Sequence, residues 1–484
     1  MELSEEIRNK YQPVIGLEIH AQMLTNTKAY SNDKNEYGAV PNNNVSPITL
    51  GHPGTLPRMN AKTIDFAIKM GLACGSDITP DQYFARKNYF YPDLPKGYQI
   101  TQDTTPICTG GAIVVKDNEG NDKSITITRI HMEEDAGKSI HDIDPFNTLI
   151  DLNRAGVPLI EIVSEPEIRT SQEAYNYVTE VRKLVRYLEI CDGNMEEGSL
   201  RCDANISVML KDSTEFGVRV EVKNMNSMRN VQRAIEHEIT RHILAIENGE
   251  QLFQETRNFD ALKGTTTAMR SKEAANDYRF FPEPDLQPIR ITPAKIESLK
   301  AEMPPLPAEL FKKYTTKFGL SEYDALLLTD QKEIALYFED ITSHTSNYKA
   351  AANWVMGDVK SYLNTNAITI GDFPITAKNV AGLITLIDEG AISHNLAGQK
   401  VFPEMLKSNR TAQEIAEEND WIQNSNADEI KDIILAVFDE NPSEYERFKN
   451  GEKKLMGFLM GKVMQKSQGK ADPKSASKLI NELI

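Results

Sequence analysis

The sequence lacks the features that mark membrane and exported proteins. No run approaches the roughly 18 consecutive apolar residues of a membrane-spanning helix. Residues 1–10 are polar and acidic, and they contain neither the apolar segment of a signal peptide nor the Arg-rich, acid-poor helix of an organelle presequence. The four cysteines, Cys74, Cys108, Cys191 and Cys202, form no C-x-x-C pair. We therefore expect a cytoplasmic protein with free thiols and no membrane partner.

Positive charge is also scarce, because 54 Lys and Arg stand against 71 Asp and Glu, for a net charge of −17. Phosphate binding is driven by Lys and Arg, so this total alone argues against a protein that coats nucleic acid. The C-terminal region differs from the total: eight lysines lie between Lys449 and Lys478, against two acids, Glu452 and Asp472. These lysines form a stripe along the sequence, and from the pattern alone this stripe is either a solvated helix face or a binding surface.

The chain of 484 residues is 40% hydrophobic, enough for buried cores, and its length suggests roughly three domains. Residues 1–295 alternate short strand-like segments with Gly, Pro and Asn clusters and a few helices, which is typical of an α+β domain. A Pro-rich stretch spans residues 302–307, and mostly helical sequence follows it. A third segment starts near Lys407 and includes a capping-box pattern, Thr411-Ala-Gln-Glu414. We predict domains at residues 1–295, 296–406 and 407–484.

Four segments of the first domain alternate with a period of two, which predicts half-buried strands over residues 14–21, 125–131, 200–208 and 217–223. Helical spacing of apolar residues predicts amphipathic helices over residues 171–188 and 230–247. The strands therefore each have one polar face available for chemistry.

Acidic side chains gather on these polar faces. Glu18 and His20 are two residues apart on one strand and project the same way, while Asp203 and Glu221 lie on the polar faces of two others. Residues 133–135 add three successive acids at a strand end. Neighbouring carboxylates repel one another, and Mg²⁺ would relieve the repulsion; an added imidazole widens the tolerance toward Mn²⁺.

An ordinary solvated surface is the alternative explanation of these acids. Arg201, Arg219 and Lys223 share the same strand faces, and mixed charge of this density can be plain surface salt bridging. The pattern alone leaves both explanations open.

Seven long blocks make the chain resemble the B subunits of tRNA-dependent amidotransferases over essentially its whole length. They are VIGLEIHAQM (from Val14), ARKNYFYPDLPKGYQITQ (from Ala85), ITRIHMEEDAGKS (from Ile127), DLNRAGVPLIEIVSEPEI (from Asp151), MEEGSLRCDANIS (from Met195), VEVKNMNS (from Val220) and DYRFFPEPDLQP (from Asp277). Blocks of this length in the family's order are far more specific than one short motif. The fit continues through NWVMGDVKSYLN (from Asn353) and GFLMGKVMQKSQGKADP (from Gly457).

The resemblance implies both a fold and an activity. The fold is an α+β cradle domain of antiparallel or mixed sheets with helices, followed by a helical domain and a small helical tail domain of the YqeY type. The activity is that of a carbon–nitrogen ligase working as a heterotrimer with an amidase A subunit, which hydrolyses glutamine, and a small C subunit. The B subunit would use ATP and Mg²⁺ to phosphorylate the side-chain carboxylate of Glu-tRNA(Gln), Asp-tRNA(Asn) or both, and ammonia would displace the phosphate.

The resemblance also implies site residues. Carried over motif by motif, the Mg²⁺ ligands are Glu18, His20, Glu134, Asp203 and Glu221. Glu134 departs from the parity of its strand, on which residues 129, 131 and 133 share a face, so a bulge or strand end would have to turn it inward.

Positive side chains must offset the repulsion between a carboxylate nucleophile and ATP. We expect Lys87 to act with Glu134 in catalysis, and Lys87, Arg201 and Lys223 to contact ATP or the acyl group. The run Tyr89-Phe90-Tyr91-Pro92 either lines the reaction cavity, stacks on the terminal adenosine of tRNA, or anchors its own loop.

Some members of the family carry two Cys pairs in a zinc site near the N-terminus. Ser31, Ser46 and Thr49 stand at the corresponding positions here, and hydroxyls do not replace thiolates as zinc ligands, so we predict no zinc.

The family likeness favours tRNA binding by the lysine stripe. The expected contacts, to phosphate and sugar, come from Lys453, Lys454, Lys462, Lys466 and Lys470. The related archaeal-type E subunit carries an inserted domain for which 484 residues leave no room. A non-catalytic tRNA-binding scaffold, whose acids are merely structural, remains the alternative function.

Overall fold

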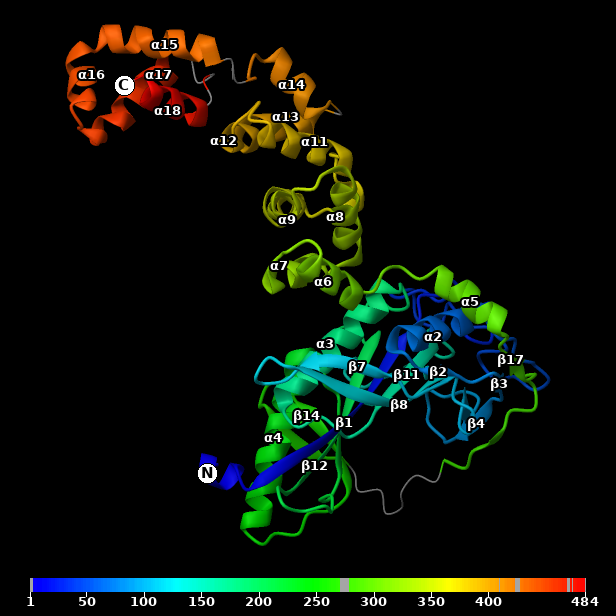
Figure 1. The fold of residues 1–484 in the computed structure, drawn as a ribbon. Coiled ribbons are helices and arrows are strands. Elements are labelled where there is room, and N and C mark those ends of the chain that lie inside the picture. Colours follow the sequence, from blue (N-terminus) through cyan, green and yellow to red (C-terminus); the bar gives the residue numbers. More distant parts are fainter. Residues whose placement is uncertain are drawn as a thin grey trace. The chain divides into compact units, whose positions relative to one another are not determined.

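The computed structural model describes residues 3–269, 278–408, 410–422, 427–467, 471 and 473–483. The chain divides into two compact units, residues 1–306 and 307–484 (Figure 1). The first unit combines a large mixed sheet with helices, and the second contains helices but no strand among its described residues. The predicted fold class is therefore confirmed, and the division falls inside the Pro-rich stretch.

The main sheet of the first unit has its principal strands in the order β15-β14-β13-β12-β1-β11-β8-β5-β4-β16. In chain order these are β1 (Tyr11–Gln22), β4 (Ala85–Asn88), β5 (Tyr98–Thr101), β8 (Asp122–Glu134), β11 (Pro158–Ser164), β12 (Leu200–Leu210), β13 (Val220–Lys223), β14 (Glu255–Asp260), β15 (Thr265–Ala268) and β16 (Phe281–Pro282). Beside β8 lie β2 (Asp77–Ile78), β6 (Cys108–Thr109) and β7 (Ala112–Lys116). The strands β13 and β14 run parallel, whereas the other paired strands run antiparallel.

Helices cover one face of this sheet because that face is apolar. The side chains of Leu17, Ile19 and Ala204 are fully buried in the core. The covering helices α2 (Ala61–Cys74), α3 (Ser171–Tyr187) and α4 (Met228–Glu247) contact β8, β1 and β12 respectively, and α3 also packs against α4 (Figure 1). The short helix α1 (Glu5–Arg8) precedes β1, and α5 (Pro293–Ala301) packs on α2. The opposite face of the sheet keeps the polar residues.

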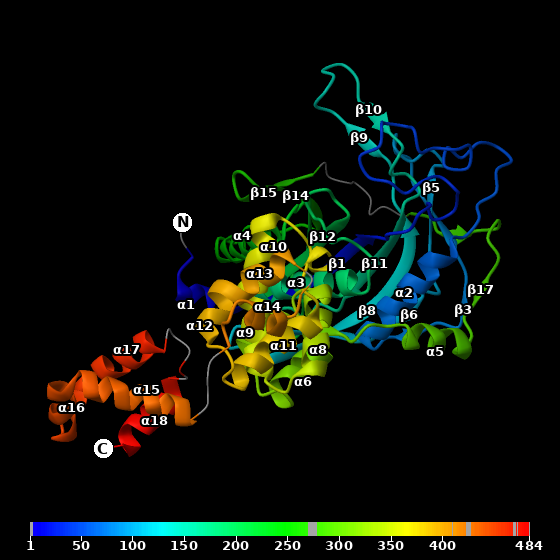
Figure 2. The ribbon, with the colours of Figure 1, turned by 90° about the horizontal axis from the view of Figure 1, so that it is seen from above.

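Two small ribbons accompany the sheet. One pairs β9 (Lys138–Ile140) with β10 (Leu149–Asp151), and Figure 2 shows it projecting from the first unit. The other pairs β3 (Asp81–Gln82) with β17 (Ile289–Arg290). Asn42 ties the loop of residues 31–60 to the first ribbon, because its amide nitrogen Nδ2 donates to the Ile150 carbonyl at 2.9 Å.

Hydrogen bonds close the loop that contains Ser31, Ser46 and Thr49. The Asp33 carboxylate oxygen Oδ2 accepts from the Ser46 backbone N–H and hydroxyl, each at 2.9 Å, and from the Thr49 hydroxyl. The Ser31 and Thr49 hydroxyl oxygens lie 3.3 Å apart. A carboxylate–hydroxyl cluster thus connects the three positions named in the sequence.

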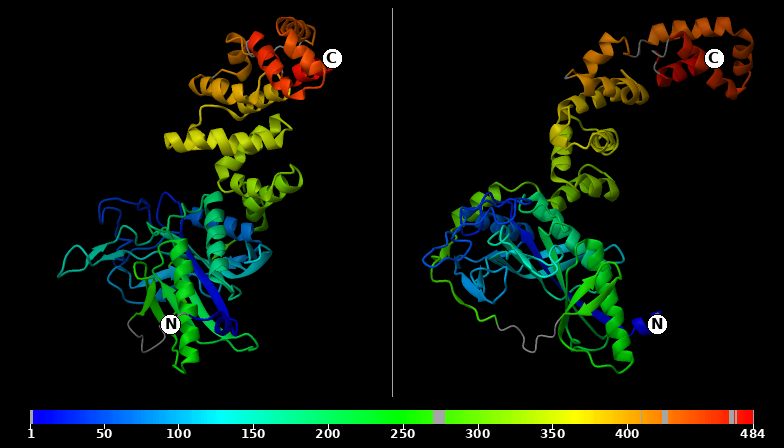
Figure 3. Two further views of the ribbon diagram at one scale, coloured as in Figure 1. Left: turned by 90° about the vertical axis from the view of Figure 1, so that its left-hand side faces the viewer. Right: turned by 180° about the vertical axis from the view of Figure 1, so that it is seen from behind.

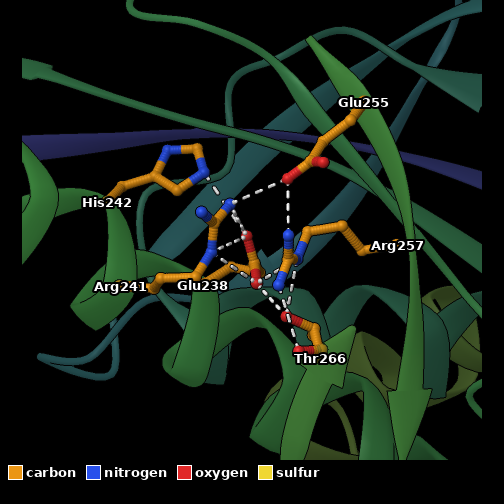
Figure 4. A network of polar contacts seen from close by, with 6 residues as sticks. All are labelled: Glu238, Arg241, His242, Glu255, Arg257 and Thr266. Atoms are coloured by element: carbon orange, nitrogen blue, oxygen red, sulfur yellow. Dashed lines mark hydrogen bonds and ion pairs between the residues drawn. The ribbon is translucent and has the colours of Figure 1, made fainter. Parts of the chain in front are cut away.

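A buried ionic network joins β14 and β15 to α4 (Figure 4). The fully buried Glu238 of α4 accepts hydrogen bonds from Arg241 and from the Thr266 hydroxyl, and it lies 3.4 Å from the Arg257 Nε. Arg257 also pairs with Glu255 at 2.5 Å. Because Glu255 and Arg257 face this network, the residue between them, Thr256, faces the other side of the sheet.

The second unit begins with helices between residues 307 and 418 (Figure 3). They are α6 (Pro307–Thr316), α7 (Glu322–Leu328), α8 (Lys332–His344), α9 (Tyr348–Trp354), η1 (Val355–Val359), α10 (Lys360–Asn366), η2 (Ile370–Asp372), α11 (Ala377–Asp388), α12 (His394–Leu396), η3 (Ala397–Val401), α13 (Phe402–Lys407) and α14 (Ala412–Glu418). The predicted capping box at Thr411 and Glu414 is present at the start of α14.

A separate core unites the last helices. They are α15 (Ala427–Glu440), α16 (Pro442–Lys449), η4 (Lys453–Leu455), α17 (Met456–Lys466) and α18 (Pro473–Glu482). Ile430, Ile434, Leu459 and Ile480 are fully buried in this core. Among the helices of the described residues, none is long and apolar enough to span a bilayer.

Candidate functional site

The polar face of the main sheet carries the candidate site. Strand register sets Glu18 of β1 opposite Asp203 of β12, and His20 opposite Glu161 of β11. Glu161 in turn lies opposite His131 of β8. Directly opposed residues of neighbouring strands project to the same side, so side chains far apart in sequence converge here.

These side chains line a pocket of about 360 Å³ on the first unit. The volume is within the range of small-ligand sites. Its acidic lining consists of Glu18, Asp103, Glu133, Glu161, Asp203 and Glu221. So dense a set of carboxylates requires cations to balance it.

Two groups in the pocket have the donor geometry of a divalent-ion site. Ligand atoms of Glu18, His20 and Asp203 all lie within 4.8 Å of one another, and the same holds for His131, Glu133 and Glu161. The His20 and Glu161 side chains, one from each group, approach to 3.8 Å.

Unsatisfied polar atoms in the pocket fit a cation site. Within the described residues, the His20 Nε2 and Glu133 Oε2 atoms are buried without a hydrogen-bond partner. Buried polar groups are rarely left so, and an ion is one explanation. Carboxylate oxygens with an imidazole nitrogen suit Mg²⁺ and Mn²⁺, so the residues present fit such an ion.

Burial sets the protonation of these groups in the absence of a cation. Burial, reinforced by the neighbouring Glu161 carboxylate, raises the pKa of Glu18, and burial likewise raises the pKa of Asp203 and Glu161. Burial also lowers the pKa of His20 well below its usual value and that of His131 to about 4. Both imidazoles are therefore neutral at pH 7, the form that can coordinate a metal.

The structure pairs each predicted anion-binding cation with an acid. The Lys223 ammonium lies 2.5 Å from Asp203 and 2.7 Å from Glu221, and Lys87 lies 3.6 Å from Glu133. Arg201 shares the polar face, but its guanidinium donates to Asp135 at 2.7 Å. Burial opposes the charge of Lys87, yet the Glu133 and Glu161 carboxylates outweigh it and raise the pKa of Lys87.

The structure places Glu134, one of the five expected ligands, outside the lining of this pocket. Its carboxylate pairs with Lys96 and accepts the Ile100 backbone N–H at 2.9 Å. The register of β8 with β11 is continuous from residue 130 to residue 134, so no bulge turns Glu134 inward and it keeps the parity of its strand. The other four predicted ligands, Glu18, His20, Asp203 and Glu221, all line the pocket.

Sequence reasoning did not select His131, Glu133 or Glu161 as ligands, although it counted Glu133 among the three acids at the strand end. The first two alternate with the apolar Ile130 and Met132, and the same parity that excludes Glu134 selects them. Glu161 is the lone charged residue of a strand that is apolar from Pro158 to Val163, and such a buried charge signals a partner or a ligand.

The aromatic run at residues 89–91 is divided between two environments. The Tyr89 ring meets Tyr278, a pocket residue, edge to face at 5.9 Å. The Phe90 and Tyr91 side chains are exposed by 86% and 62%, so they do not anchor their loop in a core.

The predicted tRNA-binding lysines differ in their surroundings. Lys453 and Lys454 are exposed in η4. Lys462 lies over the Phe458 ring, and Lys466 pairs with Glu440. Lys470 lies outside the described residues.

Comparison with models of known protein families assigns the chain to a family. The family model described as the GatB/GatE catalytic domain matches residues 13–297, and the one described as the GatB domain matches residues 336–484. The chain belongs to the GatB family. All of the pocket residues therefore lie within the matched catalytic domain.

Curated relatives agree with this assignment over their full lengths. A protein of Thermodesulfovibrio yellowstonii, named as the B subunit of aspartyl/glutamyl-tRNA(Asn/Gln) amidotransferase, is 48% identical over 475 residues, 98% of each chain. Proteins of the same name from Trichodesmium erythraeum and Clostridium botulinum are 47% and 46% identical, covering 99% and 98% of this chain and 98% of each relative. The chain is therefore a B-type subunit of the tRNA-dependent amidotransferase class.

Proposed function

We propose that the chain activates the side-chain carboxylate of Glu-tRNA(Gln), Asp-tRNA(Asn) or both with ATP and Mg²⁺, and that ammonia from a partner glutaminase then forms the amide. The partners would be an amidase A subunit and a small C subunit. The observation that carries the proposal is the pocket itself, where six carboxylates and two neutral imidazoles face one cavity.

Mg²⁺ would be held by Glu18, His20 and Asp203, with His131, Glu133 and Glu161 as a neighbouring donor group, and would supply positive charge for two anionic reactants. The carboxylate of the charged tRNA is already a competent nucleophile, so these residues need not remove a proton from it.

The remaining residues would position the reactants and limit the access of water. Lys87 and Lys223, each beside a carboxylate, could exchange that partner for a phosphate or acyl oxygen. Tyr278 and Phe280 line the same pocket and would shield a labile acyl phosphate from water. The lysines of η4 and α17 would contact the phosphates and sugars of the tRNA.

The test is amidation by the complex purified with its partner proteins, supplied with misacylated tRNA, ATP and glutamine. Asp203→Asn should lower amidation by roughly a hundredfold or more, because it removes one charged ligand from the pocket, and should leave tRNA affinity unchanged. Asp212→Asn, at an exposed position just after β12, is the matched control. Full amidation by Asp203→Asn would favour the non-catalytic scaffold.

A further inference from the structure

Arg129 differs from the other cations of the pocket. It is half-buried and lines the cavity beside the acidic groups. Within the described part of the chain, however, no carboxylate oxygen lies within 4.0 Å of its guanidinium, and no acceptor takes a hydrogen bond from it. Lys87 and Lys223, in contrast, are both paired with acids.

The register of β8 explains why Arg129 has no acidic partner on the neighbouring strands that the structure describes. Its directly opposed residues are Val163 of β11 and Thr109 of β6, and neither carries a charge. Two residues further along β8, His131 lies opposite the carboxylate of Glu161. The guanidinium therefore acts on the nearby Glu161 carboxylate, whose pKa its charge lowers against the effect of burial, without forming a direct ion pair within the described residues.

A β-bulge in β8 next to Arg129 changes the direction of the strand. Val163 pairs with Arg129, but the next residue of β11, Ser164, pairs with Ile127, so Thr128 is the extra residue on β8. Bulges are frequent next to functional sites, where they redirect a neighbouring side chain. Arg129 is the first residue after the bulge on the side of the pocket.

An unpaired guanidinium at such a position suits an anion with several oxygens. It stays charged at any physiological pH and presents a planar set of donors that matches phosphate. Lysines already bound to carboxylates must first give up a partner, whereas Arg129 has no such ion pair to break among the residues that the structure describes.

We propose that Arg129 is a phosphate-binding residue of the pocket, and that the phosphate belongs to a reactant, either the polyphosphate of ATP or the backbone at the acceptor end of the tRNA. The inference rests on the proposed function and adds a residue that the sequence pattern did not select. Lys87 and Lys223 differ from Arg129 because they also balance carboxylates before the reactants arrive.

The test compares full-length wild type with Arg129→Met, which keeps the length of the side chain, and Arg129→Lys, which keeps the charge. Isothermal titration calorimetry with Mg²⁺ and the non-hydrolysable analogue AMP-PNP measures the nucleotide arm, and filter binding with uncharged tRNA measures the RNA arm. Arg219→Met is the matched control, because Arg219 is exposed and does not line the pocket. Thermal unfolding checks that every variant folds.

In Arg129→Met, the affinity for either AMP-PNP or tRNA should fall roughly tenfold to a hundredfold. Arg129→Lys should recover part of that affinity, and Arg219→Met should show no change. A loss in the AMP-PNP arm assigns the phosphate to the nucleotide, and a loss in the tRNA arm assigns it to the RNA. Wild-type affinity of Arg129→Met in both arms overturns the inference. Failure of wild type to bind AMP-PNP at all would instead overturn the proposed ATP-dependent function.

Discussion

Replacing Glu238 by Gln should destabilise the first unit by roughly 3 kcal/mol at pH 7. Burial alone would raise the pKa of Glu238, but hydrogen bonds from Arg241 and Thr266 and the neighbouring His242 lower it to about 2 (Figure 4). Relative to the ordinary value of 4.5, this corresponds to roughly 3 kcal/mol of stabilisation at neutral pH. Removing one partner of a buried ionic network costs a similar amount, because the remaining charges lose their counterion.

The sign of the pH dependence follows from the lowered pKa. The stabilisation is complete above about pH 4.5 and is lost as the pH falls toward 2, because the unfolded state then binds the proton more readily than the folded one. Wild type and Glu238→Gln should therefore differ at pH 7 and converge in strong acid.

The cysteines of the chain can probe the stability of the first unit alone. All four cysteines are buried, and all lie in residues 1–306. Labelling of their thiols as a function of urea at pH 7 measures the opening of the first unit, and hydrogen exchange of α4 and β14 extends the comparison to low pH. The exposed Glu250→Gln should change stability by about 0.5 kcal/mol or less. Equal stability of Glu238→Gln and wild type at pH 7 would refute the argument.

Three further predictions concern the site. Glu134→Gln should lower the unfolding free energy of the first unit by about 3 kcal/mol, since it leaves Lys96 without its carboxylate. It should nevertheless keep the Mn²⁺ affinity of the pocket within about twofold, as measured by electron paramagnetic resonance; a large loss would return Glu134 to the ligand set. The Thr256 hydroxyl donates to the carboxylate of the pocket residue Glu221 at 2.8 Å. Thr256→Val should therefore weaken Mn²⁺ binding roughly fivefold, and Thr256→Ser should bind Mn²⁺ as wild type does. The same Mn²⁺ affinity in Thr256→Val and Thr256→Ser would contradict this role. The double change Lys453→Gln and Lys454→Gln should weaken tRNA binding and reduce its salt dependence by about two counterions; an unchanged salt slope would exclude phosphate contacts by this pair.

Period-two alternation predicted the strands well. The segment predicted over 14–21 is β1 (Tyr11–Gln22), and the one over 200–208 is β12 (Leu200–Leu210). These strands have one apolar and one polar face, so local pattern and tertiary packing agree. The helices over 171–188 and 230–247 are likewise α3 and α4.

The details of the site were less accessible, because they depend on register between strands. Sequence alone did not reveal that Glu161 stands between His20 and His131, since β11 lies between β1 and β8 in the sheet but not in the chain. The pairing of Lys223 with two acids, and the lack of a partner for Arg129 within the described residues, also follow only from that register.

Anomalous diffraction from crystals of the protein soaked in Mn²⁺ tests the role of the carboxylate pocket most directly. The expected result is a strong peak coordinated by Glu18, His20 and Asp203, with any second peak at His131, Glu133 and Glu161. A peak that is bound elsewhere, for example beside Glu134 and Lys96, or a pocket that takes up no Mn²⁺ at saturating concentration, would contradict the account.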